Sequence, residues 1–440
     1  MTGEGRAVTR TGEGGRFVVE GGIPVSGTVE VAGNKNEALP TLAASLLVPG
    51  EIVLERLPRI QDVSTMIELC SRLGVRVGYE DEHTVSLDAS DLSDRDPDAA
   101  LSEQIRGSFL VAPALLHRTG KAVLPRPGGD RIGRRRVDTH LLALKALGAN
   151  VETTSNAYRL TLDGRFRGTD VFLDEASVMA TENAVMAAAV AEGSTRIMNA
   201  ASEPHVQGLC RLLEGMGAAI AGIGTNCLEV EGTDDLRPVR HAISPDHIEI
   251  GSFIALAAMT GGELRIPGAV PDHLRMIRMV FARLGVETNL DGEDLIVPGE
   301  QDLVIQEDLH GAVPKVDDAP WPGFPADLTS IALVLATQSR GTVLIHEKMF
   351  ESRLFFVDRV ISMGGRVVLC DPHRALVVGP SELHGATIAS PDIRAGMALV
   401  GAALAADGRS EIMNAHQVDR GYERIDERLR ALGARIERRS

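Results

Sequence analysis

The hydrophobic pattern of this chain repeats six times. An amphipathic, helix-like stretch ends in Leu-Gly or Met-Gly and continues into an alternating, strand-like segment. Residues 62–73 and 422–432 show the helical part, and residues 75–77 and 434–436 the strand. The glycine stands where a helix ends and a positive φ is needed. The six pairs are Leu73-Gly74, Leu147-Gly148, Met216-Gly217, Leu284-Gly285, Met363-Gly364 and Leu432-Gly433.

A second pattern interleaves with the first, also six times. A helix of small apolar residues is followed by a turn glycine and a strand, as in residues 39–54 and 184–198. These helices are apolar nearly all round, as in residues 397–406, which is typical of a helix buried on most sides. The remaining turn glycines are Gly120, Gly262, Gly341 and Gly408.

Together the two patterns predict an α/β protein of six repeated units. Each unit would hold one buried helix, one amphipathic helix and several strands. Six units could form a solenoid or two closed domains of three units, and the pattern leaves both open. A length of 440 residues suits two domains of about 200 residues.

Composition excludes several classes of function. The net charge of −16 argues against a nucleic-acid partner, so any anion site must be a local cluster of cations. Four scattered cysteines predict neither a zinc site nor a disulfide framework. No apolar run is long enough for a membrane span. Residues 1–16 are rich in Gly, Thr and Glu and predict a flexible lead-in rather than a signal peptide, so we expect a cytoplasmic protein.

Two loops carry candidate anion ligands. Gly33-Asn34-Lys35-Asn36 precedes a buried helix expected to begin near Ala38, and a helix N-terminus favours anions; a solvated turn lysine is the alternative. Residues 127–140 form a glycine-rich loop whose guanidinium groups suit phosphate or carboxylate. An exposed, salt-bridged loop is the alternative there. The charged residues of this loop are Asp130, Arg131, Arg134, Arg135, Arg136 and Asp138.

A third constellation of charged residues is spread over the last two units. All of its members lie at junctions between predicted elements, and loops at equivalent places of repeated units can converge on one site. Each Asp-Arg pair could equally be a structural ion pair. The members are Asp327, Arg353, Asp392, Arg394, Asp419 and Arg420.

From about Phe17 to its end, the chain resembles the UDP-N-acetylglucosamine 1-carboxyvinyltransferase family. The resemblance rests on ordered phrases: Gly33-Asn-Lys-Asn36, Pro127-Gly-Gly129 with Ile132-Gly133, Ala180-Thr-Glu-Asn183, Asn199-Ala-Ala-Ser-Glu-Pro204, Phe324-Pro-Ala-Asp327, Phe350-Glu-Ser-Arg353, Asp392-Ile-Arg-Ala395 and Asp419-Arg-Gly-Tyr-Glu-Arg424.

The resemblance implies a fold. It is a two-domain inside-out α/β barrel of six βαβαββ units, three in each domain, with the buried helices inside. Domain one would span residues 35–244, and domain two residues 17–34 plus 245–440. The two crossings of the chain between the domains would form a hinge. Substrate bound in the cleft between the domains would close that cleft.

The resemblance also implies a reaction and its residues. The enolpyruvyl group of phosphoenolpyruvate passes to the 3-hydroxyl of UDP-N-acetylglucosamine and phosphate leaves, the first committed step of peptidoglycan synthesis. Such chemistry needs an acid, a base and cations, and no cofactor or metal is implied. The partners are these two small molecules; a monomer is compatible with the sequence, which leaves the oligomeric state open.

Roles carry over residue by residue. Lys35, Arg135 and Arg420 match phosphate ligands, with Lys35 also catalytic, and Arg353 and Arg394 match the clamp on the carboxylate. The remaining matches are Asn36 and Arg106 (substrate and nucleotide-sugar contacts), Asp327 (the base for the sugar hydroxyl), Met349 (a sugar contact), Arg135, Arg136, Val137, Asp138, Thr139 and His140 (the uridine stretch), Ser177 and Val178 (near the nucleotide phosphates) and Glu203 (a polar neighbour of the site).

Three positions depart from the family pattern. Asp130 stands where cysteine is usual; a carboxyl can also donate a proton, but it is a poor nucleophile towards the epoxide fosfomycin, so resistance is implied. Met179 replaces a glycine and Arg136 a proline. These two support an alternative, the same chemistry on another nucleotide acceptor in secondary metabolism.

Two further alternatives are disfavoured. The phrase Asp419-Arg-Gly-Tyr422 and the uridine stretch point away from the shikimate-pathway synthase. An inactive binding protein would be indicated by loss of Lys35, Asp327 or the arginines, and none is lost.

Overall fold

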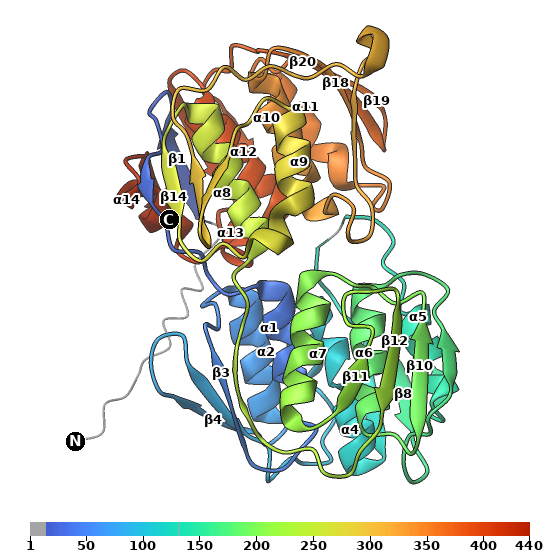
Figure 1. Cartoon of the computed structure of the whole chain (residues 1–440). Helices are drawn as coiled ribbons and strands as arrows, with labels where there is room; N and C mark the ends of the chain where they lie inside the picture. Colours follow the sequence, from blue (N-terminus) through green and yellow to red (C-terminus); the bar gives the residue numbers. More distant parts are fainter. Residues whose placement is uncertain (1–14, 131) are drawn as a thin grey trace, which may run out of the picture.

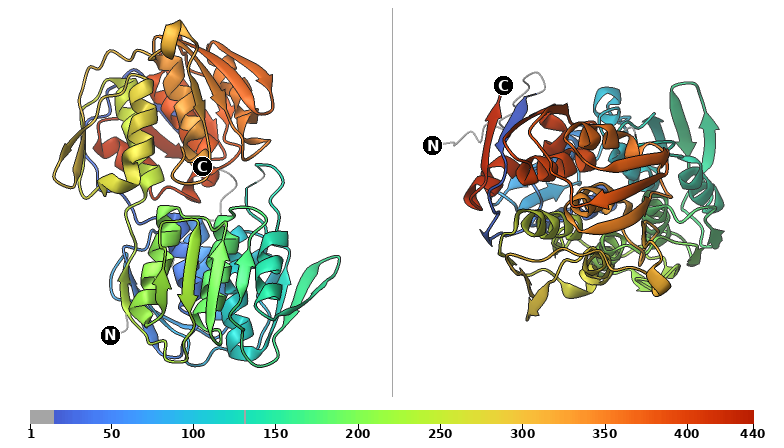
Figure 2. Two further views of the ribbon diagram at one scale, coloured as in Figure 1. Left: turned by 45° about the vertical axis from the view of Figure 1, so that its right-hand side comes forward. Right: turned by 90° about the horizontal axis from the view of Figure 1, so that it is seen from above.

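The computed structural model describes residues 15–130 and 132–440. The chain forms two lobes, one above the other in both side views (Figure 1; Figure 2, left), and each lobe has its own hydrophobic core. One core runs from Ala38 to Ile243 and belongs to the lower lobe. The other combines residues 17–29 with residues 248–436 in the upper lobe.

The sheets of the lower lobe contain three or four strands each. One has the order β13-β3-β5-β4, the next β6-β8-β7, and the third β9-β10-β12-β11. The strands are β3 (Glu51–Glu55), β4 (Arg76–Tyr79), β5 (Val85–Asp88), β6 (Lys121–Pro125), β7 (Asn150–Thr153), β8 (Ala157–Thr161), β9 (Asp170–Phe172), β10 (Ser194–Met198), β11 (Ala219–Ala221), β12 (Cys227–Glu231) and β13 (Arg240–Ala242).

The three sheets of the upper lobe have four strands each. Their orders are β2-β14-β16-β15, β17-β18-β20-β19 and β21-β22-β1-β23. The strands are β1 (Arg16–Glu20), β2 (Gly27–Thr28), β14 (Leu264–Ile266), β15 (Asn289–Asp291), β16 (Asp294–Val297), β17 (Lys315–Asp317), β18 (Gly341–His346), β19 (Val367–Asp371), β20 (Arg374–Gly379), β21 (Thr387–Ala389), β22 (Arg409–Met413) and β23 (Arg435–Arg439).

Helices fill the interior between these sheets. In the upper lobe α8, α10 and α12 pack on one another; in the lower lobe α6 packs against α1 and α4. The helices are α1 (Lys35–Ala44), α2 (Gln61–Arg72), α3 (Ala99–Ser102), α4 (Ala112–Thr119), α5 (Asp138–Ala146), α6 (Val178–Ala189), α7 (Pro204–Met216), α8 (His247–Thr260), α9 (Arg275–Arg283), α10 (Thr329–Gln338), α11 (Val357–Ser362), α12 (Ile393–Ala405), α13 (His416–Asp419) and α14 (Ile425–Ala431).

The repeat seen in the sequence corresponds to one structural unit. In the third unit the chain runs β9-α6-β10-α7-β11-β12, with β9 parallel to β10 and the other pairs antiparallel. All six glycines of the Leu-Gly and Met-Gly pairs have φ between 92° and 113°, as predicted for the residue after a helix. The fold-class prediction of six βαβαββ units in two domains, with helices inside and sheets outside, is confirmed.

The N-terminal strands complete units that lie far away in the sequence. β1 lies between β22 and β23 and pairs with both (Figure 1; Figure 2, right). β2 pairs with β14, and β13 returns to pair with β3 of the first unit. The predicted lead-in was therefore wrong at Arg16, because β1 begins there opposite Arg439; residues 1–14 lie outside the described residues.

The chain crosses between the lobes twice, and the two crossings run side by side. Asn34 N–H donates to Ser244 O at 2.8 Å, and Asp246 N–H donates to Ala32 O at 3.0 Å. Gly33 and Pro245 form an isolated β-bridge between the same segments. Within the described ranges, no helix is long and apolar enough to cross a membrane.

Candidate active site

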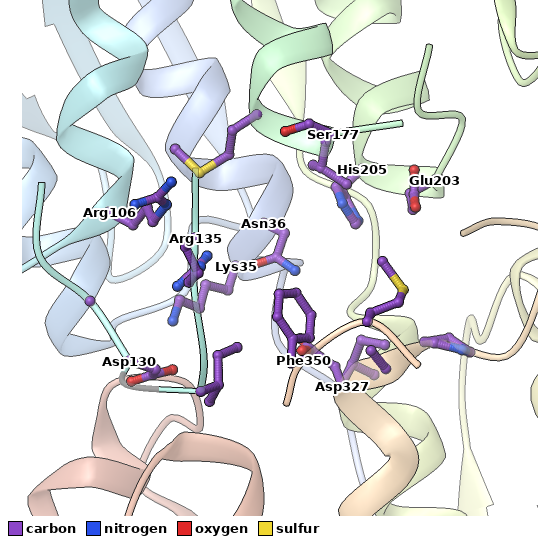
Figure 3. Close-up of a pocket in the computed structure, with 18 of the residues that line it drawn as sticks. Lys35, Asn36, Arg106, Asp130, Arg135, Ser177, Glu203, His205, Asp327 and Phe350 are labelled. Atoms are coloured by element: carbon purple, nitrogen blue, oxygen red, sulfur yellow. The ribbon is translucent and has the colours of Figure 1, made fainter. Parts of the chain in front are cut away.

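A cavity of about 490 Å³ lies where the lobes meet, and both lobes line it (Figure 3). Eight Lys and Arg side chains and six carboxyl groups line it, in a chain whose net charge is −16. The cavity is therefore a local concentration of cations, as the sequence required of any anion site. The predicted site residues that line it are Lys35, Asn36, Arg106, Asp130, Arg135, Arg136, His140, Ser177, Val178, Glu203, Asp327, Met349, Arg353, Arg394 and Arg420.

Lys35 enters the cavity from the first turn of α1. We expected this helix to begin near Ala38, but it begins at Lys35 because the side chain of Asn34 caps it. Asn34 Oδ1 accepts hydrogen bonds from the backbone N–H groups of Asn36 (2.8 Å) and Glu37 (3.2 Å). Such a cap satisfies two of the N–H groups left free at a helix start. The cap holds Lys35 and Asn36 at the cavity wall.

Asp62, at the start of α2, joins cations of the two lobes. Its Oδ2 lies 2.7 Å from Lys35 Nζ, and its Oδ1 lies 3.0 Å from Arg420 Nε. Burial would raise the pKa of Asp62, but Lys35 and Arg420 outweigh burial and lower the pKa below its ordinary value. Arg420 also donates a hydrogen bond to Asp130 through Nη1. Asp62 thus holds Lys35 and Arg420 together, and Arg420 in turn holds Asp130.

Asp327 lies between two buried arginines of the upper lobe. Arg353 Nη2 is 3.0 Å from Oδ1, and Arg394 Nη2 is 2.9 Å from Oδ2. Burial would raise the pKa of Asp327, but Arg394, Arg353 and Lys35 lower it well below its ordinary value. Asp327 is therefore ionised at neutral pH, the state that a base requires.

Each of these arginines has one buried N–H donor without a partner among the described residues. Arg353 Nε and Arg394 Nη1 are buried and make no hydrogen bond to any residue that the structure describes. Glu347 Oε2 lies 3.7 Å from Arg353 Nε, too far for a hydrogen bond. The side chains of Arg353 and Arg394 are only 2% and 5% exposed, so an incoming anion would meet little competition from water.

The loop of residues 127–137 reaches from the lower lobe to the upper lobe. Arg134 N–H donates to Glu351 Oε1 at 2.9 Å, and Ser352 N–H donates to Ile132 O at 3.1 Å. Arg106 Nη2 donates to the carbonyl of Arg136 at 2.6 Å and so fixes the base of the loop. These contacts bring Asp130 to the cavity wall opposite Asp327 (Figure 3); the neighbouring Arg131 lies outside the described residues.

Arg106 and Arg135 form a partly dehydrated pair of cations. Burial lowers the pKa of Arg135. Burial, and then repulsion from Arg135, lowers the pKa of Arg106 to about 10. Both groups remain charged at neutral pH but lack full solvation, which favours an anionic ligand between them.

The predicted uridine stretch divides in two. Arg135, Arg136 and His140 line the cavity, whereas in the described part of the chain Val137, Asp138 and Thr139 do not. The reason is local. Val137 lies just before α5, and the first two residues of that helix, Asp138 and Thr139, bond to other side chains. Thr139 Oγ1 donates to Asp174 at 2.7 Å, and Asp138 accepts from Arg136 at 3.3 Å.

Arg136 and His140 are held by neighbours from the lower lobe. Arg136 Nη2 lies 2.7 Å from Asp174 Oδ2, so its charge is already matched. His140 Nδ1 lies 2.9 Å from Asn183 Nδ2, and burial lowers the pKa of His140 to about 3. His140 is therefore a neutral ring at the cavity wall.

The start of α6 forms another part of the wall. Ser177 caps this helix, its Oγ accepting from Ala180 N–H at 3.4 Å, and Val178 and Met179 follow. A capped N-terminus of a twelve-residue helix facing a cavity favours a phosphate group. Met179 lines the cavity and also packs against the lower core.

Among the lining residues to which no role was assigned from the sequence are Asp62, Glu182, His205, His247, Trp321 and Phe350. Asp62 lies on an ordinary amphipathic helix, and only tertiary contact gives it its role. Glu182 and Phe350 lie inside phrases that carried the family resemblance, and Trp321 shortly precedes another; this was the available signal. His247 stacks on His205 at 6.0 Å between ring centroids, a contact between the lobes.

A potential metal-binding group lies outside the cavity. Carboxyl and imidazole atoms of Glu82, His83 and Glu423 come within 4.8 Å of one another. Glu82 is also paired with Arg59 at 2.8 Å, which supplies its counter-charge.

Comparison with known proteins identifies the family of this fold and site. Residues 19–429 match the family model for EPSP synthase (3-phosphoshikimate 1-carboxyvinyltransferase), and the chain belongs to that family of enolpyruvyl transferases. Within it, the chain is 53% identical over 421 residues to the UDP-N-acetylglucosamine 1-carboxyvinyltransferase of Treponema denticola, covering 96% of this chain and 98% of the relative. The protein of that name from Bradyrhizobium diazoefficiens is 54% identical over 424 residues, with the same coverage.

Solved structures share the fold. The enolpyruvyl transferase NikO from Streptomyces tendae superposes with a TM-score of 0.85 at 26% identity, covering 97% of this chain and 99% of NikO. An EPSP synthase from Acinetobacter baumannii gives 0.73 at 16% identity, covering 97% of this chain and all of that one, and it supports the fold alone.

Proposed function

We propose that this protein transfers the enolpyruvyl group of phosphoenolpyruvate to the 3-hydroxyl of UDP-N-acetylglucosamine, with release of phosphate. The observation that carries the proposal is the placement of Asp327 between Arg353 and Arg394, across one cavity from Lys35, Arg135 and Arg420. Relatives about half identical over nearly the whole chain bear the corresponding enzyme name. The step opens peptidoglycan synthesis and uses soluble metabolites, which supports a cytoplasmic location.

Phosphoenolpyruvate carries two anionic groups, and the cavity offers two groups of cations. Its carboxylate fits the unpartnered donors of Arg353 and Arg394, and its phosphate fits Lys35, Arg135 and Arg420. Asn36 and Arg106 border the same space. The nucleotide sugar then occupies the side of the cavity formed by Arg136, His140 and the start of α6, with Met349 against the sugar.

The proposed reaction proceeds by addition and elimination. The sugar 3-hydroxyl oxygen bonds to C2 of phosphoenolpyruvate and its proton passes to Asp327, while Asp130 in its protonated form gives a proton to C3. The Asp130 carboxylate then takes a proton back from C3 of the adduct, the bond from C2 to the phosphate oxygen breaks, and the C2–C3 double bond is restored. The proton held by Asp327 leaves with the phosphate. The cations stabilise the leaving phosphate as its charge grows.

Substrate binding would also prepare the base. Both arginines neutralise Asp327, which makes it a weak proton acceptor. A substrate carboxylate that takes over Arg353 and Arg394 adds a negative charge beside Asp327, and both changes raise the pKa of Asp327. Proton abstraction is thereby linked to the presence of phosphoenolpyruvate.

We further propose that the two lobes are domains that close on the substrates, residues 35–244 moving against residues 17–34 and 245–440. The paired crossings at Gly33 and Pro245 are suited to act as the hinge. The contact of Glu351 with Arg134 N–H would hold the loop of Asp130 in the closed form.

The test is a phosphate-release assay on the purified protein. Phosphoenolpyruvate is incubated with UDP-N-acetylglucosamine, other UDP-sugars or UMP in turn. Release is expected with UDP-N-acetylglucosamine and at a much lower rate with the others. Equal or faster release with UMP would instead support the alternative of another nucleotide acceptor.

A further inference from the structure

Three titratable side chains, each with a buried polar atom, line the cavity without a role in the mechanism above. Glu182 lies in the second turn of α6, Glu203 directly precedes α7, and His205 belongs to the first turn of α7. Glu182 and His205 are only 1% and 6% exposed. Glu203 is placed by a hydrogen bond of 3.4 Å from Trp321 N–H to its Oε1, across the lobe boundary.

Each of these side chains has a buried polar atom without a partner. Glu182 Oε1, Glu203 Oε2 and His205 Nδ1 make no hydrogen bond to any residue within the described ranges. A buried polar atom left unsatisfied destabilises the fold, and three such atoms at one cavity wall indicate a ligand that supplies the missing bonds.

Burial favours the neutral form of all three groups. Burial, and then repulsion from Glu203, raises the pKa of Glu182 well above its ordinary value, and burial also raises the pKa of Glu203. Burial lowers the pKa of His205 to about 4. The neutral carboxyl of Glu182 carries an O–H donor, while Glu203 Oε2 and His205 Nδ1 are the atoms left open for a ligand.

The position of the three groups identifies the part of the ligand that they meet. Glu182 lies one turn beyond Ser177 and Val178, and His205 is close enough to Asp327 for that carboxylate to act on its pKa. Figure 3 shows His205 between Ser177 and Asp327. The groups thus lie between the nucleotide side of the cavity and the base, where the sugar ring must sit.

We propose that Glu182, Glu203 and His205 form a subsite that selects a secondary amide on the acceptor sugar next to the reacting hydroxyl. The amide carbonyl accepts from the carboxyl of Glu182, and the amide N–H donates to Glu203 Oε2 or His205 Nδ1. A hydroxyl presents its donor and acceptor on a single oxygen and cannot span these groups. The inference deepens the proposed function and rests on it.

The experiment compares kcat/KM for UDP-N-acetylglucosamine and UDP-glucose at saturating phosphoenolpyruvate. Wild type is expected to favour the amide substrate by about tenfold or more, because the hydroxyl leaves buried groups unpaired. Glu182→Leu should lower kcat/KM for UDP-N-acetylglucosamine about tenfold, mainly through KM, and leave that for UDP-glucose nearly unchanged. Glu182→Gln keeps a neutral donor and acceptor and should stay within about threefold of wild type.

The controls separate the possible failures. Glu192→Gln changes an exposed glutamate just beyond the same helix and should change neither value. If wild type uses both sugars equally, the subsite is overturned but the proposed function is not. This comparison requires no variant, so it does not depend on whether a variant folds. Equal losses with both sugars in Glu182→Leu, or a Glu182→Gln as poor as Glu182→Leu, also overturn it. Wild type that uses neither sugar refutes the proposed function itself.

Discussion

Asp62 Oδ2 lies 2.7 Å from Lys35 Nζ, and both side chains are at most 10% exposed. The same carboxylate holds Arg420 of the opposite lobe through its other oxygen. Asp62 therefore holds together two cations that would otherwise repel each other. A phosphate group could perform the same neutralisation, so Asp62 pre-organises the place where we expect the phosphate of phosphoenolpyruvate.

Replacing Asp62 by Asn should destabilise the protein and make its stability depend on anions. Loss of one partner of a buried pair costs on the order of 3 kcal/mol, and inorganic phosphate should restore part of this by neutralising Lys35 and Arg420. Thermal unfolding with and without phosphate measures the effect. The expected result is a larger phosphate-induced rise in Tm for Asp62→Asn than for wild type.

The matched control for this prediction is Asp302→Asn. Asp302 pairs with Arg340 at 2.9 Å, but both side chains are largely exposed, and such pairs contribute about 0–1 kcal/mol. Its Tm and its response to phosphate should equal those of wild type. If phosphate raised the Tm of Asp62→Asn no more than that of Asp302→Asn, Asp62 would have no special relation to the anion site.

Replacing Asp327 by Asn should abolish turnover while both substrates still bind. Loss of a general base lowers the rate by about 10²-fold or more. The amide also leaves Arg353 and Arg394 without their counter-charge, so phosphoenolpyruvate should bind at least as tightly as in wild type. Single-turnover phosphate release and calorimetric titration measure the two quantities; a variant with near-normal turnover would remove Asp327 from the mechanism.

We expect the protein to resist fosfomycin, and replacing Asp130 by Cys should make it sensitive. A thiolate opens an epoxide far more readily than a carboxylate does. Cys70 and Cys210 are buried, and neither Cys227 nor Cys370 lines the cavity in the part of the chain described. Activity is followed after timed incubation with the epoxide. Time-dependent inactivation of wild type, or none in the variant, would contradict the assignment of Asp130.

His140 should weaken the fold as the pH falls. Its pKa is about 3 in the folded protein, against 6.5 ordinarily, so below pH 6.5 the unfolded chain takes up a proton that the folded chain cannot. Stability is thus lost as the pH falls from about 6.5 towards 3, by about 2 kcal/mol between pH 7 and pH 5 for this residue. The measurement is the free energy of unfolding of wild type and His140→Gln at both pH values. The variant should lose about 2 kcal/mol less than wild type; parallel losses would contradict the prediction.

Much of the fold was readable from the sequence because it depends on local periodicity. The buried helices are apolar all round, the outer helices are amphipathic, and a glycine with positive φ ends each Leu-Gly or Met-Gly helix. The two anion loops and the spread Asp-Arg pairs were visible for the same reason, since each lies in a short stretch of distinctive composition. Where a local cap competed with the periodic pattern, as at Asn34, the predicted helix start was displaced.

Contacts between distant residues were decided by the tertiary structure alone. Asp62 meets Arg420 across 358 positions of sequence, and Glu203 meets Trp321 across 118. No local pattern distinguishes Asp62 from any other acidic residue at a helix start, or Val137 and Asp138 from neighbours that do reach the cavity. Periodicity reports which face of an element is buried, whereas a site between two lobes depends on how separately folded units meet. The sequence by itself therefore determined the repeated unit and its candidate chemistry, and the packing of the two lobes decided which charges face one another.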